Sequence, residues 1–438
     1  MPLTSIRLEN FKCFEDTTDV TVAPLTIVFG RNNSGKSSIL QGLFLLRQTL
    51  DSPEQVAGLS RLNIRGPLYP AGTYVDAVHG HRSKVRMKMH VGLTVPGQSG
   101  QARIELHFRS DDPQSPLLER LAVEVPGQVA VAIQRGRGKG GPYEMWLGDK
   151  LLGIGRKAGF HFPVDSFLPK LADEPPGAAP GAGKQKRIRR RAMKAIAELA
   201  TVLGRLRAVG AFRRQPERRY DFHGRTPEVV AMAGEYVANA LIEDATRRRK
   251  PGELRRSVNR RLREVGRVHV QAVRRLFART YELRMRDLES GQWANYTDVG
   301  FGIGQALPVL VEGLRTAEGG TFIVQEPEIH LHPDAQLVMA DFLIDLVRSG
   351  RRVIVETHSD NLLLRVRHNL VRRKPRLAPN ELSVVVVEKA RKGPSSCRNL
   401  DVDRLGQIEN WPAQFMQEAT QERMAILDAV AKRVERSR

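Results

Sequence analysis

The chain has 438 residues, of which 41% are hydrophobic and 27% charged, and it carries 70 Lys and Arg against 48 Asp and Glu, a formal net charge of +22. This composition excludes collagen-like, disulfide-rich and disordered chains, and no apolar run reaches the roughly 18 residues that a membrane span needs. With two cysteines and no apolar signal segment, we expect a cytoplasmic protein of two or three domains, whose basic surface attracts polyanions such as nucleic acid.

The first fifty residues combine short strand patterns with a Gly-rich turn. The apolar run 25–29 is typical of a buried strand, and the segment 30–38 after it fits the pattern G-x-x-x-x-G-K-S/T. A helical pattern follows at 39–46. In such a loop, backbone N–H groups surround phosphate oxygens, Lys36 reaches the β- and γ-phosphates, and the Ser37 hydroxyl binds magnesium. The residues predicted to bind ATP here are Gly30, Asn32, Asn33, Ser34, Gly35, Lys36, Ser37 and Ser38.

The middle of the chain changes character twice. Short hydrophobic runs alternate with polar residues between positions 84 and 133, which predicts an antiparallel meander. The segment 174–183 is rich in Pro, Gly and Ala, and the chain beyond it is basic with a helical pattern. We therefore expect an N-terminal ATPase lobe with the phosphate loop and the meander over 1–160, a basic helical insertion over 161–295 and a C-terminal ATPase lobe over 296–438.

The arginine clusters of this insertion allow two interpretations. They could neutralise the phosphates of a nucleic acid, or they could form a solvated face or the docking surface for an acidic protein. Acidic residues are sparse inside the clusters, which favours nucleic acid, and few aromatic residues lie among them, so stacking on single-stranded bases is not indicated. The candidate contacts are Arg189, Arg190, Arg191, Arg248, Arg249, Arg260 and Arg261.

From residue 297 onward, strand and helix patterns alternate again, as in an α/β sheet. A Gly-rich turn at 298–305 opens an apolar helix and suits a phosphate. The apolar strand 321–325 ends in Glu326 and Glu328, where a magnesium ligand and a base that activates water are needed. A second buried strand ends in the segment 356–359, Glu-Thr-His-Ser.

Together these motifs resemble the ATP-binding cassette (ABC) class, and more narrowly the SMC, RecF and OLD-type ATPases. The resemblance is carried by Asn10-Phe11-Lys12-Cys13-Phe14, by the loop 30–38, by the signature-like turn 298–305, by the Walker B and D-loop run 326–333, and by the switch-histidine segment 356–359. The segments 74–79, 212–220 and 406–412 resemble those of bacterial stand-alone OLD-like ATPases. The resemblance implies an α/β fold of the ABC-head type, with a mixed central sheet, an antiparallel β subdomain and the basic helical insertion.

The resemblance also implies roles for single residues. In such heads two subunits hold two ATP molecules between them, and each nucleotide touches the phosphate loop of one subunit and the signature turn of the other. By motif position, Lys36 holds phosphate, Glu326 is the base that orients water, and His358 senses the γ-phosphate. Ser37 and, through water, Gln325 hold Mg²⁺. ATP binding across the interface is assigned to Gly302, Gly304 and Gln305.

Two positions depart from the family pattern. Gln325 stands where an acidic residue normally supports magnesium, so that either Glu326 or Glu328 compensates or hydrolysis is slow. Gly304 stands at the position of the signature serine, which removes one hydroxyl donor. Both departures favour a slow ATPase that works as a switch more than as a motor.

The functional expectation is a homodimer or larger homo-oligomer that uses ATP and Mg²⁺ to act on DNA or to control a separate effector such as a nuclease, with anti-phage defence as the setting that family association suggests. A RecF-like repair or recombination ATPase, and a scaffold that binds ATP and hydrolyses it slowly, remain alternatives.

His330 and His332 lack further metal ligands and are expected to lie in a loop. Asp401 and Asp403 are expected to be strand-end carboxylates, not a nuclease site.

Overall fold

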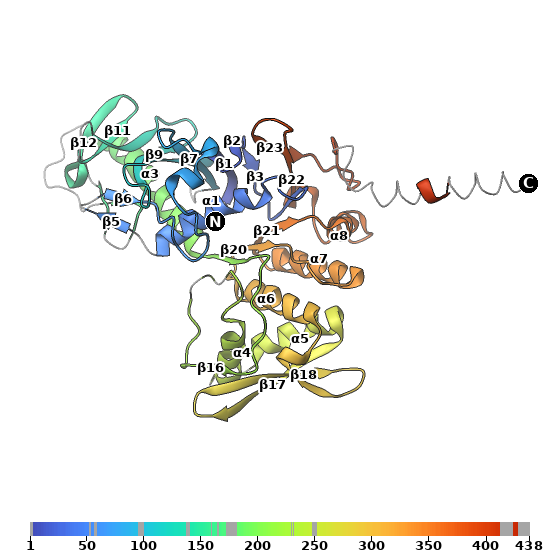
Figure 1. The fold of residues 1–438 in the computed structure, drawn as a ribbon. Helices are drawn as coiled ribbons and strands as arrows, with labels where there is room; N and C mark the ends of the chain where they lie inside the picture. Colours follow the sequence, from blue (N-terminus) through green and yellow to red (C-terminus); the bar gives the residue numbers. More distant parts are fainter. Residues whose placement is uncertain are drawn as a thin grey trace, which may run out of the picture.

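The fold is described from a computed structural model. It covers residues 3–51, 54–56, 59–94, 100–136, 141–158, 160–163, 166–171, 182–228, 230, 232–247, 252–411 and 424–427. Figure 1 shows a parallel-stranded centre with an antiparallel, β-rich part on one side of it and a helix–hairpin part below it. None of the helices in the described part of the chain has the length and apolarity that a bilayer crossing requires.

The central sheet is built from both ends of the chain. Its order is β15 (Leu206–Val209), β20 (Thr321–Gln325), β21 (Arg352–Thr357), β4 (Leu25–Gly30), β22 (Leu382–Lys389) and β23 (Ser395–Leu400). The first five strands are parallel, and β23 is antiparallel to β22. Because β4 lies between β21 and β22, the N-terminal and C-terminal ATPase segments share one sheet.

Helices cover both faces of this sheet, which explains why its inner strands β20, β21, β4 and β22 are mostly apolar and buried. On β20, Ile323 belongs to the core formed with α1 (Lys36–Asp51), whereas Phe322 and Val324 belong to the opposite core. That second core includes α6 (Phe301–Arg315), α7 (Pro333–Arg348) and α8 (Asp360–Val371). Successive strand residues point to opposite faces, so each buried strand serves both cores.

The expected meander is present. The antiparallel sheet has the order β12 (Lys150–Ile154), β11 (Tyr143–Leu147), β10 (Val131–Arg135), β9 (Leu117–Glu124), β8 (Gln101–Arg109), β7 (Met87–Thr94), β1 (Leu3–Phe11) and β2 (Phe14–Asp16), joined at its sides by β3 (Val20–Thr21), β5 (Glu54–Val56) and β6 (Leu59–Arg61). The short helix α2 (Tyr74–Ala77) and the 3-10 turns η1 (His79–His81) and η2 (Gly155–Ala158) accompany it. The α/β class with an added antiparallel β subdomain is therefore confirmed.

The region 161–295 differs from the helical insertion expected from the sequence. The strand β14 (Lys170–Leu171) pairs with β13 (Phe160–His161), α3 (Ala182–Gly204) contacts α1, and β15 joins the central sheet. Beyond them lie α4 (Val237–Thr246), α5 (Glu253–Gly266) and a small sheet of β16 (Tyr220–Asp221), β17 (Val268–Phe277), β18 (Thr280–Asp287) and β19 (Trp293–Asn295). The prediction of one helical insertion is therefore wrong, because the segment contributes to three different sheets. The chain continues through the 3-10 turns η3 (Tyr296–Asp298) and η4 (Pro379–Glu381).

Candidate active site

The predicted motifs meet at one edge of the central sheet. The strands β20, β21 and β4 are parallel neighbours, so their carboxyl ends lie at the same edge, where α/β proteins bind ligands. The strand β4 leads into the loop 30–35 and then into α1, which begins at Lys36. The ends of β20 and β21 bring Gln325 and Glu356 directly opposite each other.

The phosphate loop has a backbone that depends on glycine. Gly35 has φ +108°, and a Cβ atom there would lie 2.3 Å from the Sγ atom of Cys13. The Lys36 ammonium group is buried and donates hydrogen bonds to the carbonyls of Gly30 (2.9 Å) and Arg31 (3.1 Å). The Ser34 hydroxyl is buried without a hydrogen-bond partner in the described part of the chain. The loop therefore places the Lys36 ammonium group and the unpaired Ser34 hydroxyl beside the start of a helix. Such positively charged and hydrogen-bonding groups at a helix start suit a phosphate.

Ser37 and Gln325 share a carboxylate that sequence reasoning did not assign. The Ser37 hydroxyl donates to Oε1 of Glu356 at 2.5 Å, and the Gln325 amide donates to Oε2 of the same residue at 2.5 Å. Glu356 is 4% exposed. The carboxylate in contact with Gln325 is thus Glu356, whereas the sequence left open compensation by Glu326 or Glu328, or slow hydrolysis. A glutamate that ends a buried strand beside the phosphate loop was the available signal.

Glu326, Glu328 and His358 form a second group at the same edge. His358 Nδ1 lies 2.6 Å from Glu326 Oε2, while Glu328 accepts hydrogen bonds from the Thr357 hydroxyl (2.5 Å) and the His358 backbone N–H (3.2 Å). Glu326 has φ +46°, and its N–H donates to the Glu356 carbonyl at 2.7 Å. Burial, together with the nearby Glu328 carboxylate, raises the pKa of Glu326 to about 7. A carboxyl group with a pKa near the working pH is suited to general base catalysis.

Arg213 connects this group to the neighbouring elements. Its guanidinium donates to the carbonyls of Gln325 (2.7 Å), Glu326 (2.9 Å) and Gln305 (3.4 Å). Burial lowers the pKa of Arg213 to about 10, so the side chain stays cationic at neutral pH. In the sequence this arginine stood out only through family likeness, because its partners are backbone groups about a hundred positions away.

The glycine turn at the start of α6 is placed beside the loop after β20. A Cβ atom on Gly302 would lie 2.8 Å from the His330 carbonyl oxygen, and the Phe301 ring meets the His330 ring at 4.6 Å. The Gly304 carbonyl accepts from the Tyr296 hydroxyl at 3.2 Å. Gln305 is 4% exposed within its own chain. Its expected contact with ATP across a subunit interface therefore finds no support, since its side chain is enclosed.

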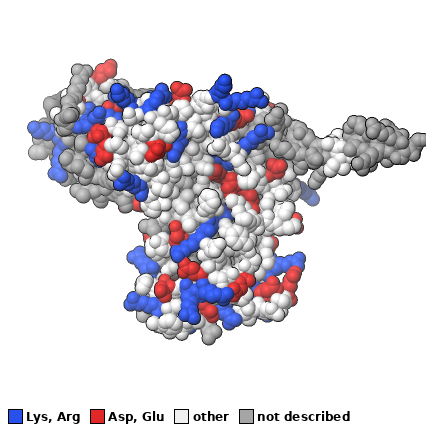
Figure 2. Space-filling view, viewed as in Figure 1, with Lys and Arg blue, Asp and Glu red and all other residues white. Residues whose placement is uncertain are grey.

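The arginines predicted to bind nucleic acid do not form one surface. Arg189, Arg190 and Arg191 lie on α3, whereas Arg260 and Arg261 lie on α5, in a different part of the molecule (Figure 1). Arg189 donates to the Ala158 carbonyl at 3.2 Å, and Arg261 pairs with Glu264 and Asp345. On the face shown in Figure 2, acidic side chains are interspersed with the basic ones. Arg248 and Arg249 lie outside the described residues.

The remaining candidate residues have local structural roles. The His332 side chain accepts a hydrogen bond from the Asp334 backbone N–H at 3.4 Å and caps the start of α7. Asp403 accepts backbone hydrogen bonds from Leu405 (2.8 Å) and Gln407 (2.7 Å) and so stabilises a turn. These contacts give His332 a role in a helix cap and Asp403 a role in a turn.

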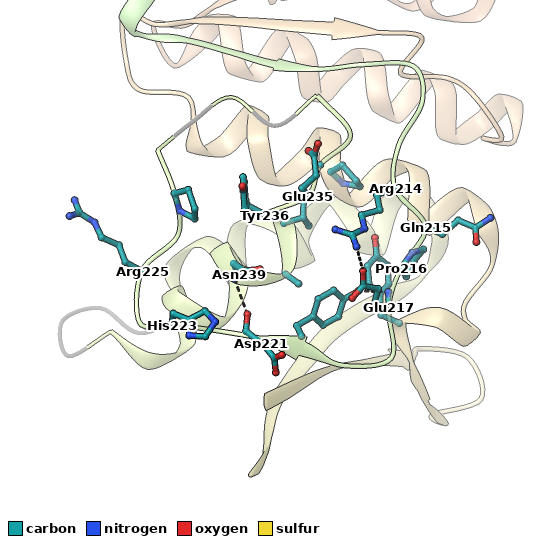
Figure 3. A pocket seen from close by; sticks show the side chains of 17 residues that line it. Arg214, Gln215, Pro216, Glu217, Asp221, His223, Arg225, Glu235, Tyr236 and Asn239 are labelled. Atoms are coloured by element: carbon teal, nitrogen blue, oxygen red, sulfur yellow. Dashed lines mark hydrogen bonds and ion pairs between the residues drawn. The ribbon is translucent and has the colours of Figure 1, made fainter. Parts of the chain in front are cut away.

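A separate cavity of about 510 Å³ lies between the segment 214–239 and α6 (Figure 3). Several of its polar groups already have partners within the chain. Arg214 pairs with Glu217, and Asn239 donates to the Asp221 carbonyl at 3.3 Å. No residue of the phosphate loop lines this cavity, so it is distinct from the sheet edge described above.

Comparison with known proteins agrees with the geometry of the sheet edge. The family model described as "AAA ATPase domain" matches residues 1–78 and 240–363, which contain the phosphate loop, the glycine turn, Glu326 and His358. No curated protein sequence matches the chain.

Three solved structures are similar to the chain at low identity. An SMC head bound to the C-winged helix domain of ScpA is 10% identical, with 92% of this chain and 99% of that chain covered and a TM-score of 0.45. The SMC head domain from Thermotoga maritima is 12% identical (92% and 100% covered, TM-score 0.39). An SMC head domain with an extended coiled coil bound to the C-terminal domain of ScpA, derived from Pyrococcus furiosus, is 11% identical (98% and 99% covered, TM-score 0.41). On the ATPase-domain match and the geometry of the site, the chain carries an ATPase domain and is an ATP-hydrolysing enzyme.

Proposed function

We propose that two copies of this chain pair around ATP and that pairing switches an activity on DNA or on a separate effector protein. One observation carries the pairing. Within the described residues, no hydrogen bond joins the glycine turn 300–302 to the phosphate loop, although both are suited to a phosphate. In the proposed pair, the turn of a second copy completes the site. The side chain of His358 is 51% exposed and Phe301 is 50% exposed, so both are available to a second copy.

Each group then has a defined task in the paired site. Lys36 neutralises phosphate charge, and Glu326 orients water and accepts its proton, for which its raised pKa is suited. Arg213 positions Glu326 by holding its carbonyl, and His358 contacts the Glu326 carboxylate at 2.6 Å. Ser37, Glu356 and Gln325 fit Mg²⁺, because a hydroxyl, a buried carboxylate and an amide provide oxygen ligands. When bound, the ion supplies positive charge at the β- and γ-phosphate oxygens.

The partner on which the paired heads act is proposed from the net charge and from the family resemblance. The net charge of +22 supports DNA, and the resemblance to stand-alone OLD-like ATPases supports an effector such as a nuclease, with anti-phage defence as the setting. Because α3 and α5 lie in different parts of the molecule (Figure 1), they offer DNA two separate basic surfaces. A RecF-like repair role would use the same ATP chemistry.

The test is ATP turnover per copy over a roughly hundredfold range of protein concentration, for the wild type and for Lys36→Ala. Pairing predicts that turnover per copy rises with concentration and then levels off, and that Lys36→Ala stays inactive throughout. Turnover per copy that is constant over the range would overturn the pairing. Adding double-stranded DNA at about 50 and 200 mM salt distinguishes DNA from an effector protein as the partner. Binding through DNA phosphates weakens steeply over that interval.

A further inference from the structure

We infer that Glu356 replaces the acidic residue missing at position 325 and is the carboxylate that supports Mg²⁺ beside Ser37. The inference rests on the proposed ATP site and names the residue that completes it. In P-loop ATPases an acidic residue holds Mg²⁺ together with the loop Ser or Thr, and in the family pattern that residue stands at position 325, the end of β20. Here it comes from the neighbouring strand β21.

The register of the sheet makes this exchange possible. Gln325 and Glu356 are directly opposite each other on parallel strands, and Glu356 is opposite Val28 on β4, the strand that leads into the phosphate loop. Neighbouring strands lie about 4.8 Å apart. A carboxylate moved from β20 to β21 therefore stays at the same level of the sheet and comes one strand closer to the loop. The 2.5 Å distance between the Ser37 hydroxyl and Glu356 Oε1 is the result.

The charge balance at Glu356 also points to a cation. Glu356 is 4% exposed, and its side-chain hydrogen-bond partners are the neutral Ser37 hydroxyl and the neutral Gln325 amide. Among the described residues, Glu356 has no ion pair with Lys, Arg or His. A buried carboxylate without a positive partner is costly, whereas a divalent cation with oxygen ligands would offset that cost.

The other two acidic side chains considered at this edge, Glu326 and Glu328, have different partners, although Oε2 of Glu328 is buried without a hydrogen bond in the described part of the chain. Glu326 is in contact with His358, and Glu328 accepts hydrogen bonds from Thr357 and from the His358 backbone. Neither is in hydrogen-bond contact with Ser37 or Gln325 in the described part of the chain. Of these three acidic side chains, Glu356 is the one in contact with the Ser37 hydroxyl, which is why we assign the role to it.

The experiment uses the full chain with Glu356→Gln, Gln325→Asp and the double variant. The measured quantity is the affinity for a fluorescent ATP analogue in Mg²⁺ and in EDTA, with the electron paramagnetic resonance of Mn²⁺ in the ATP complex as a second readout. We expect the strengthening of binding by Mg²⁺ to fall at least about tenfold in Glu356→Gln and to return in the double variant. Glu388→Gln is the matched control, because Glu388 lies near the end of β22 in the same sheet and pairs with Arg398.

The inference is overturned if Glu356→Gln keeps the wild-type response to Mg²⁺, or if the folded double variant, checked by thermal unfolding, does not regain it. Failure of the proposed ATP site, on which both the proposed function and this inference rest, looks different. In that case the wild type and Lys36→Ala bind the analogue equally poorly, in Mg²⁺ and in EDTA alike.

Discussion

At the scale of single residues, Arg213 links two elements of the active site. It is 7% exposed and holds the carbonyls of Gln325 and Glu326 on one side and that of Gln305 on the other. Glu326 has a positive φ of 46°, which a non-glycine residue adopts only when its surroundings fix it. The guanidinium therefore stabilises the backbone from which Glu326, the proposed base, projects, and we predict that Arg213 is a positioning residue.

Replacing Arg213 by Ala should lower kcat about 10- to 100-fold while leaving ATP affinity within about threefold, because the base loses its position and the phosphate loop does not. The matched control is the neighbouring Arg214→Ala. The Arg214 side chain is 60% exposed and pairs with Glu217, so kcat should stay within about twofold of the wild type. Equal losses of kcat in the two variants would show that Arg213 does not position the base.

The residues of the site differ in how far the sequence predicts them. Lys36 and Ser37 follow from a local pattern, because the loop binds phosphate with consecutive backbone groups. Glu326 and His358 are predicted because each stands at or just after the end of an apolar strand. Glu356 required the register between β20 and β21, and Arg213 required knowledge of which carbonyls lie beside it. Such contacts join positions far apart in the chain and leave no local pattern.

At the scale of elements, the two glycines in the first turn of α6 differ in how closely their surroundings pack. Gly302 lies where a Cβ atom would be 2.8 Å from the His330 carbonyl oxygen, which is closer than van der Waals contact. At Gly304 the nearest atom to an added methyl group would be Cγ of Pro216 at 3.5 Å, an ordinary contact. The family position that departs from serine is therefore the less constrained of the two.

Gly302→Ala should destabilise the protein by about 1–3 kcal/mol, because the loop after β20 must move to admit the methyl group. Gly304→Ala should be neutral or should stabilise by up to about 1 kcal/mol, since alanine is the better helix former. Thermal or denaturant unfolding of both variants measures the difference. A loss at Gly304→Ala as large as that at Gly302→Ala would contradict the packing account of α6.

The elements of the middle region show where the sequence patterns fail. The antiparallel meander was predicted because its strands alternate and pair with their neighbours in sequence. The strand β15 has only four residues, and it pairs with β20, which follows more than a hundred residues later. Its basic flanks favoured a helical interpretation, and only the long-range partner determines that this segment is a strand.

At the scale of the whole molecule, the ATPase site exists only because the two ends of the chain share one sheet. β4 from the N-terminal end lies between β21 and β22 from the C-terminal end, which brings Lys36 to the same edge as Glu326 and His358. The glycine turn of α6 lies beside the loop after β20 and leaves the phosphate loop without a hydrogen bond from it in the described residues. In a paired assembly, the glycine turn of one copy would supply the phosphate contacts that the phosphate loop of the other copy lacks.

The most direct test is the mass of the purified protein in solution, by light scattering, with and without ATP and Mg²⁺, for the wild type, Lys36→Ala and Glu326→Gln. The account predicts that ATP doubles the mass of the wild type and that the doubled form persists longest in Glu326→Gln, which binds ATP and lacks the base. Lys36→Ala should keep its starting mass. A mass that is the same with and without ATP in both the wild type and Glu326→Gln would contradict the pairing of two copies around the nucleotide.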